Sequence, residues 1–124
     1  MSRGRTNMQI GSDTHDFSDD AIELIAGRFR IFAEPMRLRI LLALGEKELC
    51  VGEIVETTGA QQANISKHLG ILLEAGMVKK RKDGLNSFYR IVDPTILELC
   101  GTVCSSLREK IRGEEEAVKS FARR

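Results

Sequence analysis

Apolar residues recur at the spacing of amphipathic helices through most of the chain. From Ser18, which favours a helix N-cap, such a pattern runs to position 33 and contains Ile22, Ile25, Phe29 and Phe32. Pro35, well tolerated in a first helical turn, starts a second helix that ends at Gly45 and is apolar on most sides. We predict that this second helix is the centre of the core. Residues 1–17 lack helical periodicity, which predicts a disordered N-terminal tail.

The middle of the chain predicts a short helix, a tight turn and a longer helix. The short helix spans about 51–58 and stops at Gly59, and the longer one spans about 61–75. The apolar side of the longer helix contains Ile65, Leu69, Leu72 and Leu73. Its other side contains Gln62, Ala63, Ser66, Lys67 and Gly70, with Gln61 and Asn64 at the margins. This layout is typical of a helix-turn-helix unit.

A basic hairpin follows the longer helix. Residues 77–81 and 87–92 have strand-like composition, and Asp83-Gly84 predicts the turn between them. A hairpin in this position is a wing, the two-stranded element that accompanies the recognition helix in many DNA-binding proteins. Lys82 and Asn86, near its tip, are candidates for contacts with the minor groove or with backbone phosphates.

The last predicted helix begins after Asp93-Pro94. Its apolar stripe contains Ile96, Leu99, Cys100, Val103, Leu107 and Ile111. The helices from 35 to 75 already supply a core for one small domain, so an extra amphipathic helix at each end predicts pairing with a second copy. We therefore predict a mainly α, winged helix-turn-helix domain over 18–112, with five helices and a two-stranded wing, dimeric through its terminal helices. Residues 113–124 form either a charged tail or an extension of the last helix.

The charge distribution favours a nucleic-acid partner. The 124-residue chain has a formal net charge of only +1, yet residues 61–92 hold six Lys or Arg against two Asp or Glu. A local basic stripe of this kind is typical of a phosphate-contacting face, although a solvated hairpin is the alternative. No apolar run approaches the roughly 20 residues of a membrane span, and the first ten residues lack an apolar signal core. These features predict a cytoplasmic protein with no membrane partner.

The polar side of the longer helix has the chemistry of base recognition. Gln and Asn can bond adenine edges, Lys can reach guanine or phosphate, and Ser can serve either. We predict that Gln62, Ser66 and Lys67 enter the major groove, with Gln61 and Asn64 assisting. The alternative is an ordinary amphipathic surface helix, and the helix-turn-helix spacing decides against it.

The sequence resembles the ArsR/SmtB family of winged-helix repressors. The resemblance is carried by AEPMRLRILLAL, ELCVGEI, ISKHLGILLEAGMV and GLNSFYRI, and it covers roughly residues 20–112. It implies a homodimer that binds double-stranded operator DNA and releases it when an inducer binds. Inducers in the family include thiophilic and divalent metals, arsenite, and reactive sulfur or oxidants.

The metal sites that the resemblance suggests are incomplete in this chain. The family's zinc-type site falls on Asp93, Thr95, Ser106 and Glu109, without either of its imidazoles. Its thiolate site, ELCVC, is ELCVG here, with Cys50 present and Gly52 in the second place. We predict neither site, and no required cofactor.

Cys100 and Cys104 form the remaining sensor candidate. They are four residues apart and so share one side of a helix. Such a pair can chelate a thiophilic metal or metalloid with a third ligand, or be oxidised or persulfidated. Whether Cys50 approaches them is left open by the sequence. The alternative is that the cysteines only pack, since free cysteine behaves as a small hydrophobe.

Other classes of protein fit the sequence less well. A small thiol enzyme or metal-buffering protein needs an activated cysteine, and His68 lies near none in the sequence. The chain is therefore predicted not to be an enzyme, and His68 is predicted to pack or to bond the backbone. A winged helix that binds a protein is disfavoured by the basic wing and the Gln-Gln start of the longer helix.

Overall fold

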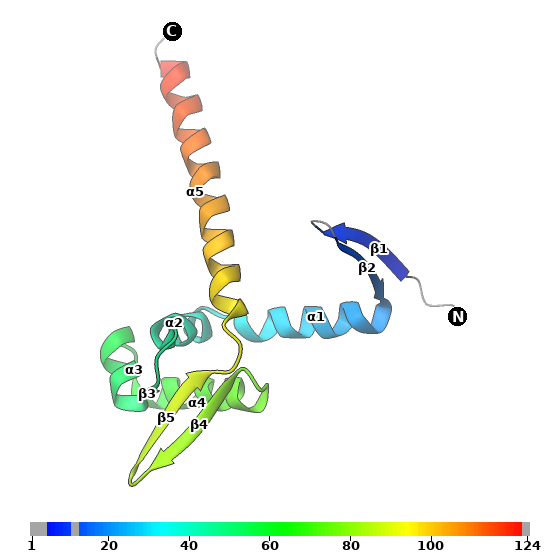
Figure 1. Cartoon of the computed structure of the whole chain (residues 1–124). Coiled ribbons are helices and arrows are strands. Elements are labelled where there is room, and N and C mark those ends of the chain that lie inside the picture. The colour runs from blue at the N-terminus through cyan, green and yellow to red at the C-terminus, as the bar shows by residue number, and fades with distance from the viewer. Residues whose placement is uncertain (1–4, 11–12, 123–124) are drawn as a thin grey trace.

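A computed structural model describes residues 5–10 and 13–122, with side chains from residue 16 to residue 121. The described helices are α1 (Asp19–Phe32), α2 (Pro35–Leu44), α3 (Val51–Thr58), α4 (Gln62–Glu74) and α5 (Thr95–Ala122). The described strands are β1 (Arg5–Ile10), β2 (Asp13–Ser18), β3 (Leu49–Cys50), β4 (Val78–Asp83) and β5 (Asn86–Ile91). The predicted winged helix-turn-helix with five helices is confirmed (Figure 1).

Local chemistry sets the helix boundaries. Ser18 Oγ accepts a hydrogen bond from the N–H of Ala21 at 3.2 Å, which confirms the predicted N-cap of α1. At the start of α2, Glu34 Oε2 accepts from the N–H of Arg37 at 2.9 Å. That hydrogen bond lowers the pKa of Glu34 from its ordinary value. Gly59 ends α3 with a φ of 71°, a left-handed conformation that glycine adopts without a Cβ clash.

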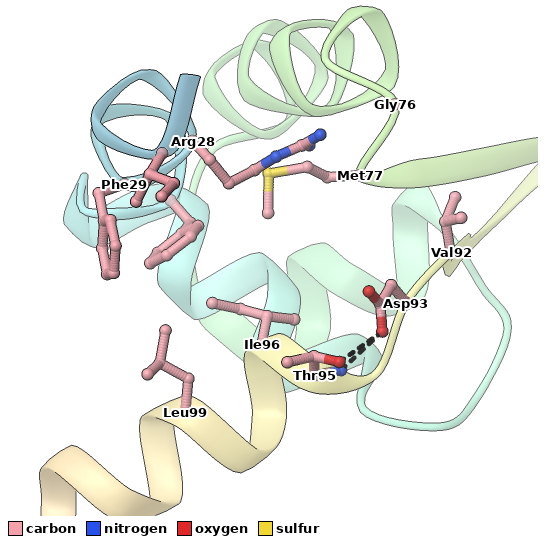
Figure 2. A pocket seen from close by; sticks show the side chains of 11 residues that line it. Arg28, Phe29, Gly76, Met77, Val92, Asp93, Thr95, Ile96 and Leu99 are labelled. Carbon is pink, nitrogen blue, oxygen red and sulfur yellow. Dashed lines mark hydrogen bonds between the residues drawn. The ribbon is translucent and has the colours of Figure 1, made fainter. Parts of the chain in front are cut away.

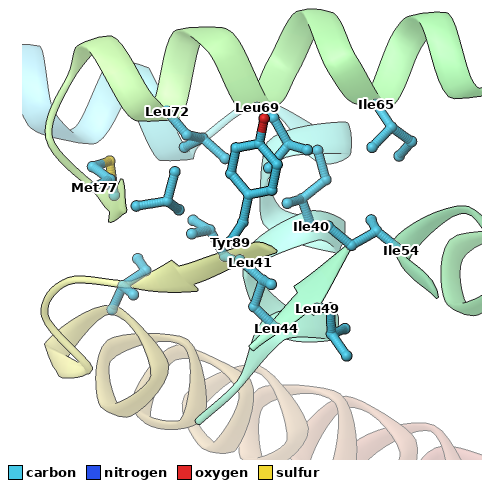
Figure 3. Close-up of a cluster of buried hydrophobic side chains, with 12 residues drawn as sticks. Ile40, Leu41, Leu44, Leu49, Ile54, Ile65, Leu69, Leu72, Met77 and Tyr89 are labelled. Atoms are coloured by element: carbon cyan, nitrogen blue, oxygen red, sulfur yellow. The ribbon is translucent and has the colours of Figure 1, made fainter. Parts of the chain in front are cut away.

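The core lies between α2, α3, α4 and the sheet (Figure 3). Its fully buried side chains are Ile40, Leu41, Leu44, Ile54, Ile65, Leu69, Leu72 and Val78. Because α2 supplies three of them, its predicted central place is confirmed. The inward placement of Leu73 is wrong: this side chain is 37% exposed, because it lies off the stripe formed by Leu69 and Leu72.

The sheet has one more strand than the predicted wing. Its order is β3-β5-β4, and all neighbours are antiparallel. The short strand β3 pairs Leu49 with Tyr89, which ties the start of α3 to the wing. The predicted turn is also shifted by one residue. Asp83 pairs with Asn86 as the last rung of the hairpin, so Gly84 and Leu85 form its two-residue loop, with Gly84 at a φ of 63°.

The N-terminal segment is a hairpin where the sequence predicted a disordered tail. Strands β1 and β2 are antiparallel, with Arg5 opposite Ser18 and Ile10 opposite Asp13. The prediction rested on the absence of helical apolar periodicity. Strand pairing needs only backbone N–H and C=O groups, so that criterion does not detect it. Residues 1–4 and 11–12 of the predicted tail lie outside the described residues.

Helices α1 and α5 extend away from the rest of the molecule (Figure 1). We call α2 to β5 the body and these two helices the arms. Helix α5 continues without a break to Ala122, so of the two alternatives for the C-terminal segment, the helix extension is correct as far as that residue. In the part of the chain that is described, no helix has the length and apolarity needed to cross a membrane.

Candidate nucleic-acid interface

The polar side of α4 faces solvent along its length. Gln61, the N-cap residue, and Gln62, Asn64, Ser66 and Lys67 are all exposed, as are the small residues Ala63 and Gly70. The opposite side contributes Ile65, Leu69 and Leu72 to the core. Since α3, the 59–61 turn and α4 follow one another against α2, the helix-turn-helix arrangement is present with its polar side outward.

A cation that the sequence analysis did not select lies beside this surface. Exposed Arg39 of α2 lines one hollow together with Gln61, Asn64 and Lys67. The N-terminal turn of α4 forms part of the hollow, and Gln61 makes no side-chain cap bond to that turn. The helix containing Arg39 was interpreted only as a core element. Charged residues are seldom buried, so an arginine in a mainly apolar helix is a candidate for the surface, and that signal could have identified Arg39.

The wing contributes several exposed basic residues. Lys79, Lys80, Lys82 and Arg90 are exposed, and Lys82 and Asn86 lie within two residues of the wing loop. Figure 1 shows the wing and α4 on the side of the body away from α5. The two elements predicted to contact DNA therefore lie on the same side of the molecule.

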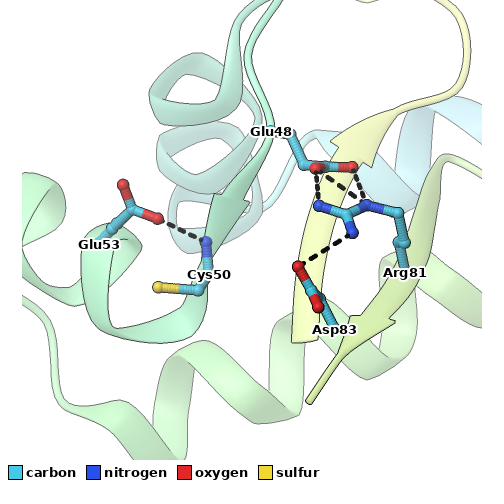
Figure 4. A network of polar contacts seen from close by, with 5 residues as sticks. All are labelled: Glu48, Cys50, Glu53, Arg81 and Asp83. Atoms are coloured by element: carbon cyan, nitrogen blue, oxygen red, sulfur yellow. Dashed lines mark hydrogen bonds and ion pairs between the residues drawn. The ribbon is translucent and has the colours of Figure 1, made fainter. Parts of the chain in front are cut away.

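Arg81 differs from the other bases of the stripe because it is already paired (Figure 4). Its Nη2 lies 2.6 Å from Oε1 of Glu48, its Nε donates to the same carboxylate, and its Nη1 lies 3.6 Å from Asp83 Oδ2. The guanidinium also stacks 5.0 Å from the ring centre of Phe88. The hydrogen bond from Arg81 lowers the pKa of Glu48, so the carboxylate stays ionised and offsets the arginine. Arg81 and Glu48 thus form an ion pair where the wing joins the rest of the body, at a place that we call the wing root. The net positive charge that the basic stripe offers to DNA is therefore smaller than the count of its Lys and Arg residues suggests.

The three cysteines do not assemble into one site. Cys50 is the half-buried N-cap of α3, and its N–H donates to Glu53 Oε1 at 3.1 Å (Figure 4). Cys100 is half-buried against the core, whereas Cys104 is exposed on the next turn of α5. Among the described residues, no three His, Cys, Asp or Glu side chains are grouped so that they could hold a metal ion. Within one chain, a three-thiol site made of these cysteines is therefore not formed.

Asp93, the first position of the zinc-type ligand set, acts as a helix cap. Its Oδ1 accepts hydrogen bonds from the N–H of Thr95 at 3.0 Å and from Thr95 Oγ1 at 2.7 Å. The backbone hydrogen bond is the main reason why the pKa of Asp93 is lowered. Among the described residues, neither Asp93 nor Glu109 belongs to a group of three His, Cys, Asp or Glu side chains that could hold a metal ion.

A cavity of about 470 Å³ lies where the arms meet the body (Figure 2). Its walls are mainly apolar and come from both arms, from the turn after α4 and from the connection between β5 and α5: Ile25, Phe29, Phe32, Met77, Ile96 and Leu99. Arg28 forms part of the wall and donates to the carbonyl of Ala75 at 3.0 Å, which ties α1 to the end of α4. The arms therefore leave apolar surface uncovered where they join the body.

Comparisons with known proteins agree with this geometry. Residues 34–80 match the family model described as bacterial regulatory protein, arsR family. An uncharacterized HTH-type transcriptional regulator of Methanocaldococcus jannaschii is 44% identical over 78 residues, which are 62% of this chain and 88% of that protein.

Two solved structures are similar in fold and in sequence. The crystal structure of Rv0081 from M. tuberculosis has a TM-score of 0.67 and 35% identity, and the match covers 78% of this chain and 98% of that one. The AntR antimony-specific transcriptional repressor has a TM-score of 0.66 and 27% identity, with 76% and 86% covered. With its helix-turn-helix, its wing and these relatives, the chain belongs to the ArsR family of DNA-binding, winged-helix transcriptional repressors.

Proposed function

We propose that the protein acts as a homodimer, that it reads operator DNA through α4 and the wing, and that an inducer acting on cysteine thiols releases it. The observation that carries the DNA-reading role is the exposed polar side of α4 on the same side of the body as the wing. In this role Gln62, Ser66 and Lys67 contact base edges in the major groove, and Gln61 and Asn64 assist.

Backbone contacts surround this reading surface. Lys82 and Asn86 lie near the end of the wing, where they can position the protein on phosphates or in the minor groove. Arg39 is a further candidate for a backbone contact, because it shares a hollow with Lys67. Arg81 contributes less than its charge suggests, since Glu48 neutralises it.

The arms support the homodimer. Apolar residues remain exposed on α1 (Ile22, Leu24, Ile25 and Phe29) and along α5 (Val103, Leu107, Ile111 and Val118). Exposed apolar surface of this extent is typical of protein–protein interfaces. A twofold pairing of the arms would present two copies of α4 to half-sites about one DNA turn apart, ~34–36 Å.

The cysteine pair on α5 is the candidate inducer site. Cys104 is accessible, and Cys100 lies one turn away on the same helix. Two thiolates of one chain need a third ligand to hold a thiophilic ion, and a paired copy or a small thiol can supply it. A specific observation also favours the second candidate, a repressor whose cysteines do not sense, because Cys100 packs against the core.

Fluorescence anisotropy on promoter DNA from upstream of the protein's own gene tests this proposal. The reduced protein is titrated alone and then with arsenite, antimonite, cadmium, zinc, an organic persulfide and peroxide. A Cys100→Ser/Cys104→Ser variant is the matched control. We expect salt-dependent binding and release of the wild type, but not of the variant, by a thiol-reactive agent.

Two other results are informative. Tight DNA binding that none of these agents changes would indicate that the cysteines only pack. It would support the second candidate, a repressor whose cysteines do not sense. No salt-dependent binding to any promoter fragment would contradict the DNA-reading role itself.

A further inference from the structure

Three helices meet at the side chain of Arg37. Arg37 lies in the first turn of α2, and its Nε donates to the carbonyl of Ile31, while its Nη2 donates to the carbonyl of Arg30 at 3.4 Å. Both carbonyls belong to the last turn of α1, where helical carbonyls have no partner within the helix. The guanidinium therefore caps the C-terminal end of α1, and its positive charge suits that end of the helix dipole.

The remaining end of the same guanidinium reaches the recognition helix. Arg37 Nη1 lies 3.2 Å from Nδ1 of His68, which belongs to α4 and is 8% exposed. Among the described residues, His68 is the buried polar side chain of the core. In the sequence it directly follows Lys67, which lies on the exposed polar side of α4. One half-buried arginine thus connects the end of α1 to the middle of α4.

Because arginine can only donate hydrogen bonds, its contact with His68 determines which nitrogen of the imidazole carries the proton. A guanidinium has only N–H donors, so Nδ1 of His68 must accept the hydrogen bond, and the ring must be neutral with its proton on Nε2. A second charged group, Glu34 at the N-cap of α2, places its Oε2 3.7 Å from the same Nδ1. Protonation would remove the acceptor, set two cations side by side and turn Nδ1–H toward Glu34. The Arg37–His68 bond can therefore exist only while the imidazole is neutral.

This bond can hold α4 in a way that the core cannot. The contacts of Ile65, Leu69 and Leu72 are non-directional, so they tolerate small rotations and slides of α4. A hydrogen bond to a ring nitrogen is directional in distance and angle. We propose that Arg37 and His68 are positioning residues, which fix the orientation of the recognition helix against the end of α1 and so couple the α1 arm to DNA reading.

This inference rests on the proposed function, since its readout is DNA binding. Loss of the acceptor is tested with His68→Leu, and His68→Asn is the matched control, because the Asn carbonyl oxygen can occupy the position of Nδ1. Arg37→Lys keeps the charge but removes the fork that joins Arg30, Ile31 and His68. Arg112→Lys, exposed on α5, controls for the chemistry of that substitution.

Affinities for the operator and for a scrambled duplex are measured for each protein, together with dimer mass and Tm. We expect His68→Leu and Arg37→Lys to weaken operator binding about tenfold, as for a lost hydrogen bond to a charged group. Binding to scrambled DNA should change little. His68→Asn should stay within about threefold of the wild type, and Arg112→Lys should match it.

The ratio of operator to scrambled affinity separates positioning from simple packing, because His68→Asn restores the acceptor without restoring the ring. Equal ratios for the wild type, His68→Leu and Arg37→Lys would overturn the proposal. So would a His68→Asn ratio as low as that of His68→Leu. If His68→Leu fails to fold, His68→Asn and Arg37→Lys still decide.

A readout without DNA separates failure of this inference from failure of the proposed function. Imidazole ¹⁵N shifts should show an unprotonated Nδ1 in His68 at neutral pH. A proton on Nδ1 would overturn the bridge even if DNA binding were normal. A wild type that binds no DNA would instead overturn the DNA-reading function, and the positioning role with it, whatever the ring state.

Discussion

The body and the arms treat apolar side chains in opposite ways. In the body, α2, α3 and α4 supply most of the buried core against the sheet, although Leu42 and Leu73 are exposed. In the arms, α1 has no buried residue, and α5 leaves Val103, Leu107 and Ile111 about half exposed although they share one stripe. Both regions have amphipathic helical sequence, so the difference lies in what each apolar side meets. The body buries most of its own apolar surface, whereas the arms leave much of theirs exposed in the single chain.

The largest expected effect is a loss of stability caused by a substitution in the core of the body. Ile40→Ala removes a fully buried side chain from α2, so it should lower the free energy of unfolding by about 2–5 kcal/mol. Leu42→Ala is the matched control, because Leu42 lies in the same helix but is 56% exposed. Urea denaturation followed by circular dichroism measures both. Equal losses for the two variants would contradict the assignment of the core.

Breaking the arms should separate assembly from folding. A Leu107→Glu/Ile111→Glu variant places two charges on the exposed stripe of α5, which should prevent burial against a second copy. Analytical ultracentrifugation should show a monomer, and operator affinity should fall by at least tenfold, because two half-sites are no longer held together. Arg108→Glu, between the two positions and also exposed, should remain dimeric. A double variant that stays dimeric would place the interface elsewhere.

Within the body, two basic residues should differ in their effect on DNA binding. Lys67 is exposed on α4, so Lys67→Ala should reduce the slope of log affinity against log salt by about one counterion. Arg81 is held by Glu48, so Arg81→Ala should reduce the slope by less. Anisotropy titrations over a series of salt concentrations measure both slopes. A larger change for Arg81 than for Lys67 would contradict the assignment of Arg81 to the wing root.

The smallest expected effect is on the acid stability of the wing root. Arg81 lowers the pKa of Glu48 in the folded protein, so the pair's contribution to stability is present above the carboxyl's unfolded-state pKa. It is lost as the pH falls through the lower, folded-state value. Glu48→Gln should therefore reduce the difference in denaturation midpoint between about pH 7 and pH 3. An identical pH dependence in both proteins would show that the exposed pair contributes nothing measurable.

The features that the sequence predicted correctly depend on neighbours in the chain. The N-cap at Ser18, the start of α2 at Pro35 and the polar side of α4 all follow from residues within one or two helical turns. Candidate DNA contacts were selected on the same basis, and the structure leaves Gln62, Ser66 and Lys67 exposed together. Their contacts with DNA remain predictions. Strands β1 to β3 were not predicted, because the pairing of short strands leaves little mark on apolar periodicity.

The sequence by itself determined the order of helices, the two-sided character of α4 and the presence of an apolar stripe on each arm. Only the tertiary structure decided which charges are free and which are paired. Arg81 meets Glu48 across 33 positions of sequence, and Arg37 meets His68 across 31. The local sequence shows that a side chain is charged or polar. Its partner is determined only when folding brings distant segments of the chain together. Local residue types therefore predict helices and their faces, and packing decides which of those residues remain available to DNA.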